Sequence, residues 1–223
     1  MEILFCQEEI FTDLVEGLII SRLNVWVRGR LDRNQFGFTG GRSTSHYVGS
    51  LLASVNGAIR GHKMVTCLSV DMTAAFDRML RERGIEGLLR WGPATGVEES
   101  QCFAACARWL RQFLRRRTVA VRYKDEVSGV RDSTVGVPQG TRAGPFLWVV
   151  FINSLLEEFR QIIDALYNDP ALSHISFRIG IDAYADDIVL SIETQCAADV
   201  AVILPVLVGL LESWCDEQHM LLS

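Results

Sequence analysis

The sequence predicts an α+β fold in which a small antiparallel sheet is backed by helices. Two observations support this prediction: long segments carry apolar residues at helical spacing, and shorter segments bounded by turn residues have the composition of strands. The chain has 223 residues, of which 49% are hydrophobic. That is enough for one large domain or for two small lobes that share a core.

The first quarter of the chain is predicted to be helical. Apolar residues at helical spacing predict an amphipathic helix over residues 10–23, and a turn rich in Gly and Arg follows at 34–44. Ser43 or Thr44 can cap a second helix, which ends at Gly61. The apolar face of this helix is expected to consist of Val48, Leu51, Leu52, Val55 and Ile59.

A strand is predicted over residues 64–72, where side chains alternate between two faces. Asp71 lies at the end of this strand, on the face that carries small residues. A helical segment is expected from about residue 73 to 91, and Gly92-Pro93 ends it.

The second half alternates helices and hairpins. Helices are predicted over residues 103–114, 146–163 and 197–216. Hairpins are predicted over residues 118–135 and 177–193. Between them, GVPQGTRAGP at 136–145 is a loop punctuated by Gly and Pro.

The formal net charge is −5 and the pI about 5.4, which argues against binding of nucleic acid by bulk charge. Any such contact would need a local basic patch. The strongest candidate combines Trp109 with the arginines Arg108, Arg111, Arg115, Arg116 and Arg117. A solvated, charged helix face explains this cluster equally well.

The six cysteines include no C-x-x-C pair and are expected to be free thiols in a reducing compartment. No secretory signal is recognised. The most apolar run, residues 200–211, is short for a membrane span and contains Pro205. We therefore expect a buried helix there and no association with a membrane.

Asp186 and Asp187 lie at the tip of an apolar hairpin. Adjacent carboxylates repel each other and are costly to desolvate unless a cation neutralises them. The pair alone is more often an ordinary polar turn, but Asp71 also ends a predicted strand. If these strands lie side by side, the carboxylates can converge on Mg²⁺. Two such ions about 4 Å apart would serve in-line phosphoryl transfer.

Four segments in order then carry a family resemblance: QFGFTGGRST, SVDMTAAFD, GVPQGTRAGPFLWVVFIN and YADDIVL. Together they resemble the fingers and palm of reverse transcriptases, and most closely those of non-LTR (LINE-type) retrotransposons. The resemblance covers residues 10–222, almost the whole chain. It implies a right-hand polymerase fold with the thumb absent. Residues 1–63 would form part of the fingers and residues 64–223 the palm, with a finger-like insertion at about 92–135.

The resemblance implies roles for particular residues. Asp71, Asp186 and Asp187 match the catalytic, metal-binding aspartates, and the carbonyl of Met72 would complete the shell around two Mg²⁺ ions, for which Mn²⁺ could substitute. Phe76 matches the aromatic gate that blocks a ribose 2′-OH and so favours dNTPs. A core aromatic residue is the alternative for Phe76.

Further positions match the parts of the family that contact nucleotide or primer. Gln139 and Gly140 match the loop that lines the dNTP pocket, and Tyr184 would pack near the primer terminus. Arg42 matches a fingers arginine that meets template or incoming phosphates, although a solvated surface arginine is an alternative. Asp182 shares a strand face with Tyr184 and is expected to be exposed. Arg115 and Arg116 are the candidate primer–template contacts in the basic cluster.

The sequence departs from the family at both ends. It lacks the upstream Arg-Pro-Ile segment, and it stops before the Asn and Lys that usually follow. We expect a fragment of a larger element protein or a truncated copy, which lacks the thumb and any endonuclease or zinc-binding regions. The expected partners of the complete protein are an RNA template, a DNA primer or target DNA and dNTPs, with a nuclear location.

Three alternatives stay open. A group II intron or retron-like reverse transcriptase is disfavoured by GPFLWVVFIN. A viral RNA polymerase tends to place an acidic residue, not Phe76, at the sugar gate. A truncated, non-catalytic remnant that at most binds nucleic acid is compatible with every motif.

Overall fold

The computed structural model describes residues 2–5, 10–93, 96–115, 117–138 and 140–222. The chain divides into two compact units. The first comprises Met1–Arg30 and Ala74–Val150, and the second comprises Leu31–Thr73 and Phe151–Ser223.

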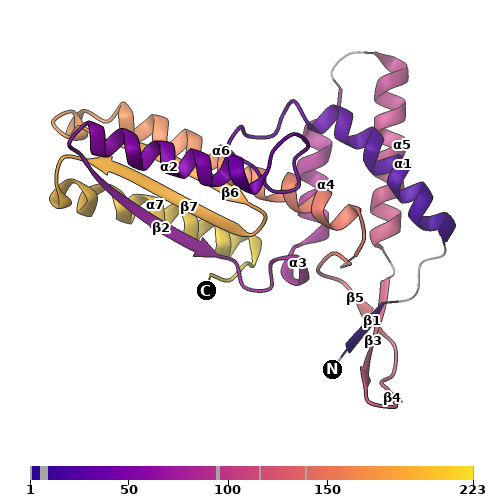
Figure 1. Cartoon of the computed structure of the whole chain (residues 1–223). Helices are drawn as coiled ribbons and strands as arrows, with labels where there is room; N and C mark the ends of the chain where they lie inside the picture. Colours follow the sequence, from indigo (N-terminus) through magenta and orange to yellow (C-terminus); the bar gives the residue numbers. More distant parts are fainter. Residues whose placement is uncertain (1, 6–9, 94–95, 116, 139, 223) are drawn as a thin grey trace. The chain divides into compact units, whose positions relative to one another are not determined.

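The second unit is built on a three-stranded antiparallel sheet with the strand order β2-β7-β6 (Figure 1). Its strands are β2 (Met64–Asp71), β7 (Asp187–Thr194) and β6 (Arg178–Tyr184). The register between β2 and β7 runs from the pair Met64 and Thr194 to the pair Asp71 and Asp187. This pairing confirms the strand predicted over 64–72 and the hairpin predicted over 177–193.

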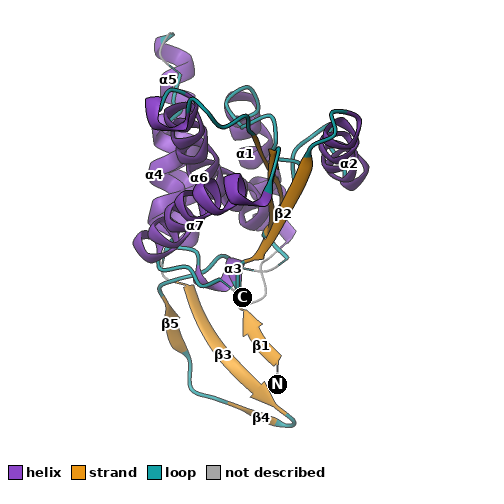
Figure 2. Cartoon of the chain, turned by 90° about the vertical axis from the view of Figure 1, so that its left-hand side faces the viewer, coloured by secondary structure: helices purple, strands orange, loops and turns teal. Residues whose placement is uncertain are grey.

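Helices cover both faces of this sheet (Figure 2). Helix α2 (Thr44–Arg60) lies on one face, and α7 (Ala197–Gln218) lies on the other together with the C-terminal part of α6 (Ala143–Tyr167). A short 3-10 helix, η1 (Pro170–Leu172), follows α6. The core between the sheet and α7 is apolar and fully buried, and it includes Ile181, Ile188, Leu190, Ile203 and Leu207.

Helix α7 is long and apolar enough to cross a membrane, the one such helix in the described part of the chain. A single helix of this kind is weak evidence for a membrane span, because the core helix of a soluble protein has the same length and composition. In the structure α7 contacts β7, and Leu207, Leu211 and Trp214 are buried. Its opposite face is exposed and includes Val202 and Val206.

The first unit combines helices with a second small sheet. Its helices, besides the start of α6, are α1 (Ile10–Val27), α3 (Ala75–Arg78), α4 (Arg81–Arg90) and α5 (Val97–Leu114). Its strands are β1 (Glu2–Phe5), β3 (Arg117–Tyr123), β4 (Glu126–Val127) and β5 (Arg131–Ser133). Helix α5 packs against both α1 and α4, and the rings of Trp26 and Phe103 meet edge to face, 5.5 Å apart.

The α+β class is confirmed, but three local expectations need correction. The helix expected over 73–91 is divided into α3 and α4, because the backbone is extended at Met79 and Leu80. Strand β1, which pairs with β3, was not predicted at all. The predicted helix 103–114 begins earlier, at Val97.

The expected apolar face of α2 was wrong at three of its five positions, whereas Leu51 and Val55 are half-buried. Val48, Leu52 and Ile59 are about half exposed or more, at 48%, 54% and 63%. The sheet face beneath α2 carries Asp182 and Tyr184, so the helix presents smaller and more polar side chains to it. Those that contact this face or are buried there are Tyr47, Ser50 and Ala58.

The two compact units do not follow the division predicted from the family. They group residues 31–63 with the sheet β2-β7-β6, and residues 74–150 with the N-terminal helix. The assignment of 1–63 to fingers and 64–223 to palm stays a prediction.

We expect Leu207→Ala to destabilise the protein by about 2–5 kcal/mol, because Leu207 is fully buried and its truncation leaves a cavity. Val206→Ala is the matched control: it lies one residue away on the exposed side of α7 and should change stability by less than about 0.5 kcal/mol. Urea unfolding followed by circular dichroism measures both. Equal losses would contradict the packing described for α7.

Candidate active site

Two aspartates face each other at one end of the sheet in the second unit. Asp71 is the last residue of β2, and it pairs directly with Asp187, the first residue of β7. Directly opposite residues of an antiparallel pair point to the same face, with Cβ atoms roughly 5 Å apart. Tyr184 pairs with Asp187 from the other side, so Ala185 and Asp186 form a two-residue turn between β6 and β7. The register therefore brings Asp71 and Asp187 together, and Asp186 lies in the adjoining turn.

The tip of this hairpin is held by the loop that precedes α2. The amide of Ala183 donates to the carbonyl of Asn34 (2.9 Å), and the amide of Phe36 donates to the carbonyl of Ala183 (2.8 Å). Gly37 then passes so close that an added Cβ would lie 2.2 Å from the nitrogen of Ala185. Ala185 itself has φ +57, in the left-handed region that non-glycine residues seldom adopt. The loop thus supports a backbone conformation that is costly for alanine.

The carboxylates repel one another. The pKa of Asp187 is raised, first by partial burial and then by the negative charges of Asp186 and Asp71. The pKa of Tyr47 is raised as well, first by burial and then by the charges of Asp187 and Asp182. Both shifts show that negative charge accumulates at this end of the sheet.

The donor chemistry at this end fits a hard divalent cation, which takes carboxylate and carbonyl oxygens. No group of three or more His, Cys, Asp or Glu side chains in the described ranges is already gathered closely enough to hold a metal ion. Met72 follows Asp71 with a buried side chain, and its main chain forms a β-bridge with Leu222. Asp71 and Asp187 are exposed, so a cation can reach them from solvent.

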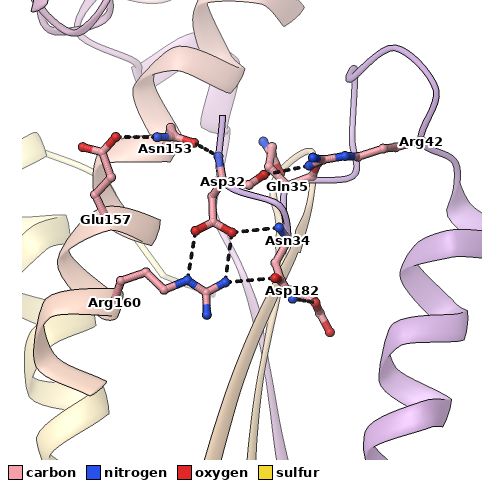
Figure 3. A network of polar contacts seen from close by, with 8 residues as sticks. All are labelled: Asp32, Asn34, Gln35, Arg42, Asn153, Glu157, Arg160 and Asp182. Atoms are coloured by element: carbon pink, nitrogen blue, oxygen red, sulfur yellow. Dashed lines mark hydrogen bonds and ion pairs between the residues drawn. The ribbon is translucent and has the colours of Figure 1, made fainter. Parts of the chain in front are cut away.

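A polar network anchors the same loop to α6 (Figure 3). Arg160 donates to both carboxylate oxygens of Asp32 (2.9 and 3.0 Å) and to the side-chain oxygen of Asn34 (2.9 Å). Asn153 accepts from the amide of Asp32 (2.7 Å) and donates to Glu157 (2.7 Å). Burial alone would raise the pKa of Asp32, but the Arg160 guanidinium and the Asn34 amide hold it below its ordinary value.

Asp182 belongs to this network, and the expectation that it is exposed was wrong. Only 4% of its surface is accessible. It accepts hydrogen bonds from the side-chain amide of Asn34 and from the hydroxyl of Ser50 (3.1 Å). Burial raises its pKa, and the two donors partly oppose this. Asp182 is therefore a buried residue of β6 that connects this strand to α2 and to the loop before it.

Arg42 also serves the loop in this structure. Its Nη1 donates to the main-chain carbonyls of Asp32 (2.7 Å) and Gln35 (2.5 Å). Gln35 is fully buried, and its side-chain amide has no hydrogen-bond partner among the described residues. The structure therefore shows Arg42 bracing the turn, and its contact with nucleotide or template stays a prediction.

The other predicted nucleotide-binding residues lie in the first unit. Phe76 is half-buried in α3, with its ring 5.3 Å from that of Trp148. The amide of Val137 donates to the carbonyl of Phe76 (2.8 Å), so the start of the 136–145 loop runs beside α3. Gly140 has φ +85, a conformation that glycine adopts freely. Gln139 lies outside the described residues.

The predicted primer–template residues belong to different units. Tyr184 is half-buried, and its ring packs 5.8 Å from that of Tyr47. Arg115 is exposed and lies 3.6 Å from a carboxylate oxygen of Glu82. Arg116 lies outside the described residues. Part of the basic cluster is thus neutralised by an acidic neighbour.

Sequence reasoning missed the network behind the β6–β7 hairpin. Asn153, Glu157 and Arg160 lie on one face of α6, at the spacing i, i+4 and i+7, and Asn153 is fully buried. That face was the available signal for a buried polar contact. Its partners, Asp32 and Asn34, come from a turn more than a hundred residues earlier, and pattern reasoning could not connect the two.

Residues 13–223 match the sequence profile described as reverse transcriptase (RNA-dependent DNA polymerase). The chain belongs to the reverse transcriptase family. Among curated proteins, it is 30% identical over 207 residues to a probable RNA-directed DNA polymerase from transposon BS of Drosophila melanogaster. That match covers 91% of this chain and 20% of the relative. A probable RNA-directed DNA polymerase from transposon X-element of the same species is 24% identical and covers 86% and 18%.

A third relative, a putative 115 kDa protein in the type-1 retrotransposable element R1DM, is 24% identical over 95% of this chain and 18% of its own length. The chain thus spans about a fifth of the length of these relatives, and it is a reverse transcriptase domain homologous to non-LTR retrotransposon proteins.

The fold resembles telomerase from Candida tropicalis (TM-score 0.53, 13% identity, 87% of this chain, 36% of that one). It also resembles telomerase from Candida albicans in complex with a TWJ fragment of telomeric RNA (0.56, 12%, 95%, 35%).

We expect Gly37→Ala to displace the hairpin tip, because the new Cβ would overlap the main chain of Ala185. The expected cost is about 1–3 kcal/mol of stability. Gly29→Ala is the control, since a Cβ there meets nothing within 4 Å. Chemical denaturation compares the two, and a Gly37 variant as stable as the Gly29 variant would contradict the close approach.

Removal of one repelling carboxylate should stabilise the metal-free protein. In EDTA at pH 7, Asp187→Asn is expected to raise the melting temperature by about 1–3 °C. The effect is small because solvent and salt screen the charges of exposed side chains. Because the pKa of Asp187 is raised in the folded state, its destabilising charge develops as pH rises through that pKa. The difference should therefore vanish below the ordinary aspartate pKa, where both side chains are neutral.

Added Mg²⁺ should reduce the same difference in melting temperature, because it should stabilise the unaltered protein more than the variant. Differential scanning fluorimetry across pH and Mg²⁺ concentration measures both effects. A variant that is less stable than the parent in EDTA would contradict the repulsion.

Proposed function

We propose that this chain carries the nucleotidyl-transfer centre of an RNA-directed DNA polymerase, which adds dNTPs to a primer 3′-OH on an RNA template. The observation that carries the proposal is the pairing of Asp71 with Asp187 beside Asp186, in a chain of the reverse transcriptase family. Family members use divalent metal ions in general, and the mutual repulsion of these carboxylates supports the same requirement here.

Mg²⁺ is the proposed cofactor, as two ions, with Mn²⁺ as a possible substitute. When bound, such ions lower the pKa of the attacking hydroxyl and neutralise charge on the leaving pyrophosphate. Asp71, Asp186 and Asp187 would hold the ions, and the carbonyl of Met72 would add a neutral oxygen. The hairpin and the loop behind it keep the aspartates at a fixed spacing, so the transition state meets charges that are already in place.

The proposed nucleotide contacts come from the sequence motifs. Phe76 would occupy the volume of a ribose 2′-OH, and Gln139 with Gly140 would line the nucleotide pocket. Tyr184 would pack near the primer terminus. Arg42 is proposed to meet nucleotide or template phosphates, which would require at least part of its bonding to the turn to change.

Template and primer contacts are proposed for Arg115 and Arg116. In non-LTR elements the primer is nicked target DNA, which supports a nuclear site of action. The relatives are about five times longer than this chain, so a thumb and an endonuclease supplied by a longer protein are part of the proposal.

The test is primer extension on an RNA template with Mg²⁺, using this chain and a longer version that includes a thumb. We expect Asp186→Asn to reduce incorporation on the order of 100-fold or more, because a ligand charge is removed from the reacting centre. Asp125→Asn, at an exposed hairpin turn, is the matched control and should keep full incorporation. Incorporation unchanged by Asp186→Asn would overturn the metal assignment.

The same experiment separates the second candidate, a remnant without catalytic activity. Retention of Asp71 and Asp187 as a strand pair, with Asp186 in the adjoining turn, favours an active centre. If neither the chain nor the longer version incorporates dNTPs, the remnant is the better account.

A further inference from the structure

Arg81, the first residue of α4, is a buried arginine whose side chain holds the main chain together. It is 9% exposed. Its Nε donates to the carbonyl of Gly136, and Nη1 donates to the carbonyls of Leu114 (2.9 Å) and Ser133 (2.7 Å). Nη2 donates to the Ser133 hydroxyl (2.7 Å) and to the carbonyl of Val135 (2.7 Å). One side chain thus ties α4 to the end of α5, to β5 and to the loop that follows.

The chemistry of this contact is uncommon for an arginine. A buried cation is costly unless it is paired or fully hydrogen-bonded. Within the described ranges, the hydrogen-bond partners of Arg81 are all neutral, while the neighbouring Glu82 pairs with Arg111 (3.1 Å) and Arg115 (3.6 Å). Burial and the charge of Arg117 lower the pKa of Arg81. Four carbonyl dipoles and the Ser133 hydroxyl compensate the charge, which requires all of these groups to be in place together.

The loop held by Arg81 is locked onto α3 immediately afterwards. The amide of Gly136 donates to the carbonyl of Met79 (2.9 Å), and the amide of Val137 donates to that of Phe76 (2.8 Å). Gly136 has φ +72, and an added Cβ would lie 2.5 Å from the carbonyl oxygen of Asp77. These hydrogen bonds fix the main chain of residues 136 and 137 against residues 76–79. The Arg81 side chain fixes the same loop through its hydrogen bonds to residues 133, 135 and 136.

We infer that Arg81 is a positioning residue for the nucleotide pocket. It fixes the start of the Gly136–Gly140 loop relative to Phe76 without itself touching nucleotide. This inference rests on the proposed function, which makes Phe76 the sugar gate and the loop a wall of the dNTP site. Without the hydrogen bonds of Arg81, the loop could move relative to Phe76. The affinity for dNTPs and the discrimination against rNTPs would then fall together.

The test compares Arg81→Met, Arg81→Lys and Ser133→Ala with Arg83→Met, whose side chain is half exposed and pairs with Glu86 at the surface. In primer extension by the thumb-containing protein, Arg81→Met should raise the KM for dNTP by about 10-fold or more. The KM for primer–template should change little. Arg81→Lys should recover part of the loss, because an ammonium can reach some of the same carbonyls.

Ser133→Ala removes one of the five hydrogen bonds made by Arg81, together with the bond from the Ser133 hydroxyl to the carbonyl of Val135 (3.1 Å), and it guards against a variant that does not fold. It should raise the KM for dNTP about 2- to 3-fold, in line with the loss of one or two hydrogen bonds. Use of rNTPs relative to dNTPs should rise in Arg81→Met, toward the ratio of Phe76→Ala. The Arg83→Met protein should match the parent in both measurements. An unchanged KM for dNTP in Arg81→Met and Ser133→Ala would overturn the inference.

Hydrogen exchange on the same proteins keeps the two proposals apart. The amides of Gly136 and Val137 should exchange faster in Arg81→Met and Ser133→Ala than in Arg83→Met. If the parent protein incorporates no dNTP, the proposed function fails, and the exchange result alone decides whether Arg81 sets the loop. Equal exchange in all variants would refute the positioning role.

Discussion

The antiparallel register between β2 and β7 is the constraint on which the rest of this structure depends. It places Asp71 opposite Asp187 and sets the turn that carries Asp186. A slip of one residue would send Asp187 to the other face of the sheet, into the apolar core against α7. The alternation of apolar and small residues on β2 disfavours that slip, because it would remove the apolar side chains of one face from the core. Burial of these side chains therefore also fixes the spacing of the carboxylates.

Each unit contains an arginine that supports a loop carrying or preceding predicted site residues. In the second unit, the Asn34–Phe36 segment pairs with Ala183, and Arg160 and Asp32 secure the turn behind it. In the first, Arg81 holds the loop that begins at Gly136. In both cases a buried or half-buried guanidinium secures a segment of irregular backbone, directly through carbonyls for Arg81 and through the side chains of Asp32 and Asn34 for Arg160. Loops near a reaction centre need such support, because they lack the regular hydrogen bonds of helices and strands.

Sequence patterns predicted what depends on local chemistry. Strand alternation located Asp71, and the pair of aspartates located the turn after Tyr184. The break between α3 and α4 was missed, because Met79 and Leu80 suit a helix and only the packing of the following loop makes the chain extended there. The burial of Asp182 was missed for a related reason. Its partners, Asn34 and Ser50, lie on other segments, and their proximity is a property of the tertiary fold.

The aspartates at the end of β2 and the start of β7 bear on how an acidic protein could bind nucleic acid. The formal charge of −5 describes the protein without ions. In the proposed loaded state, each divalent cation would cancel two of those charges, and it would do so at the edge where a polyanion must approach. The charge presented to a template would then depend on ion occupancy. Association with nucleic acid would be thermodynamically linked to divalent concentration, and monovalent salt would act on it separately through screening.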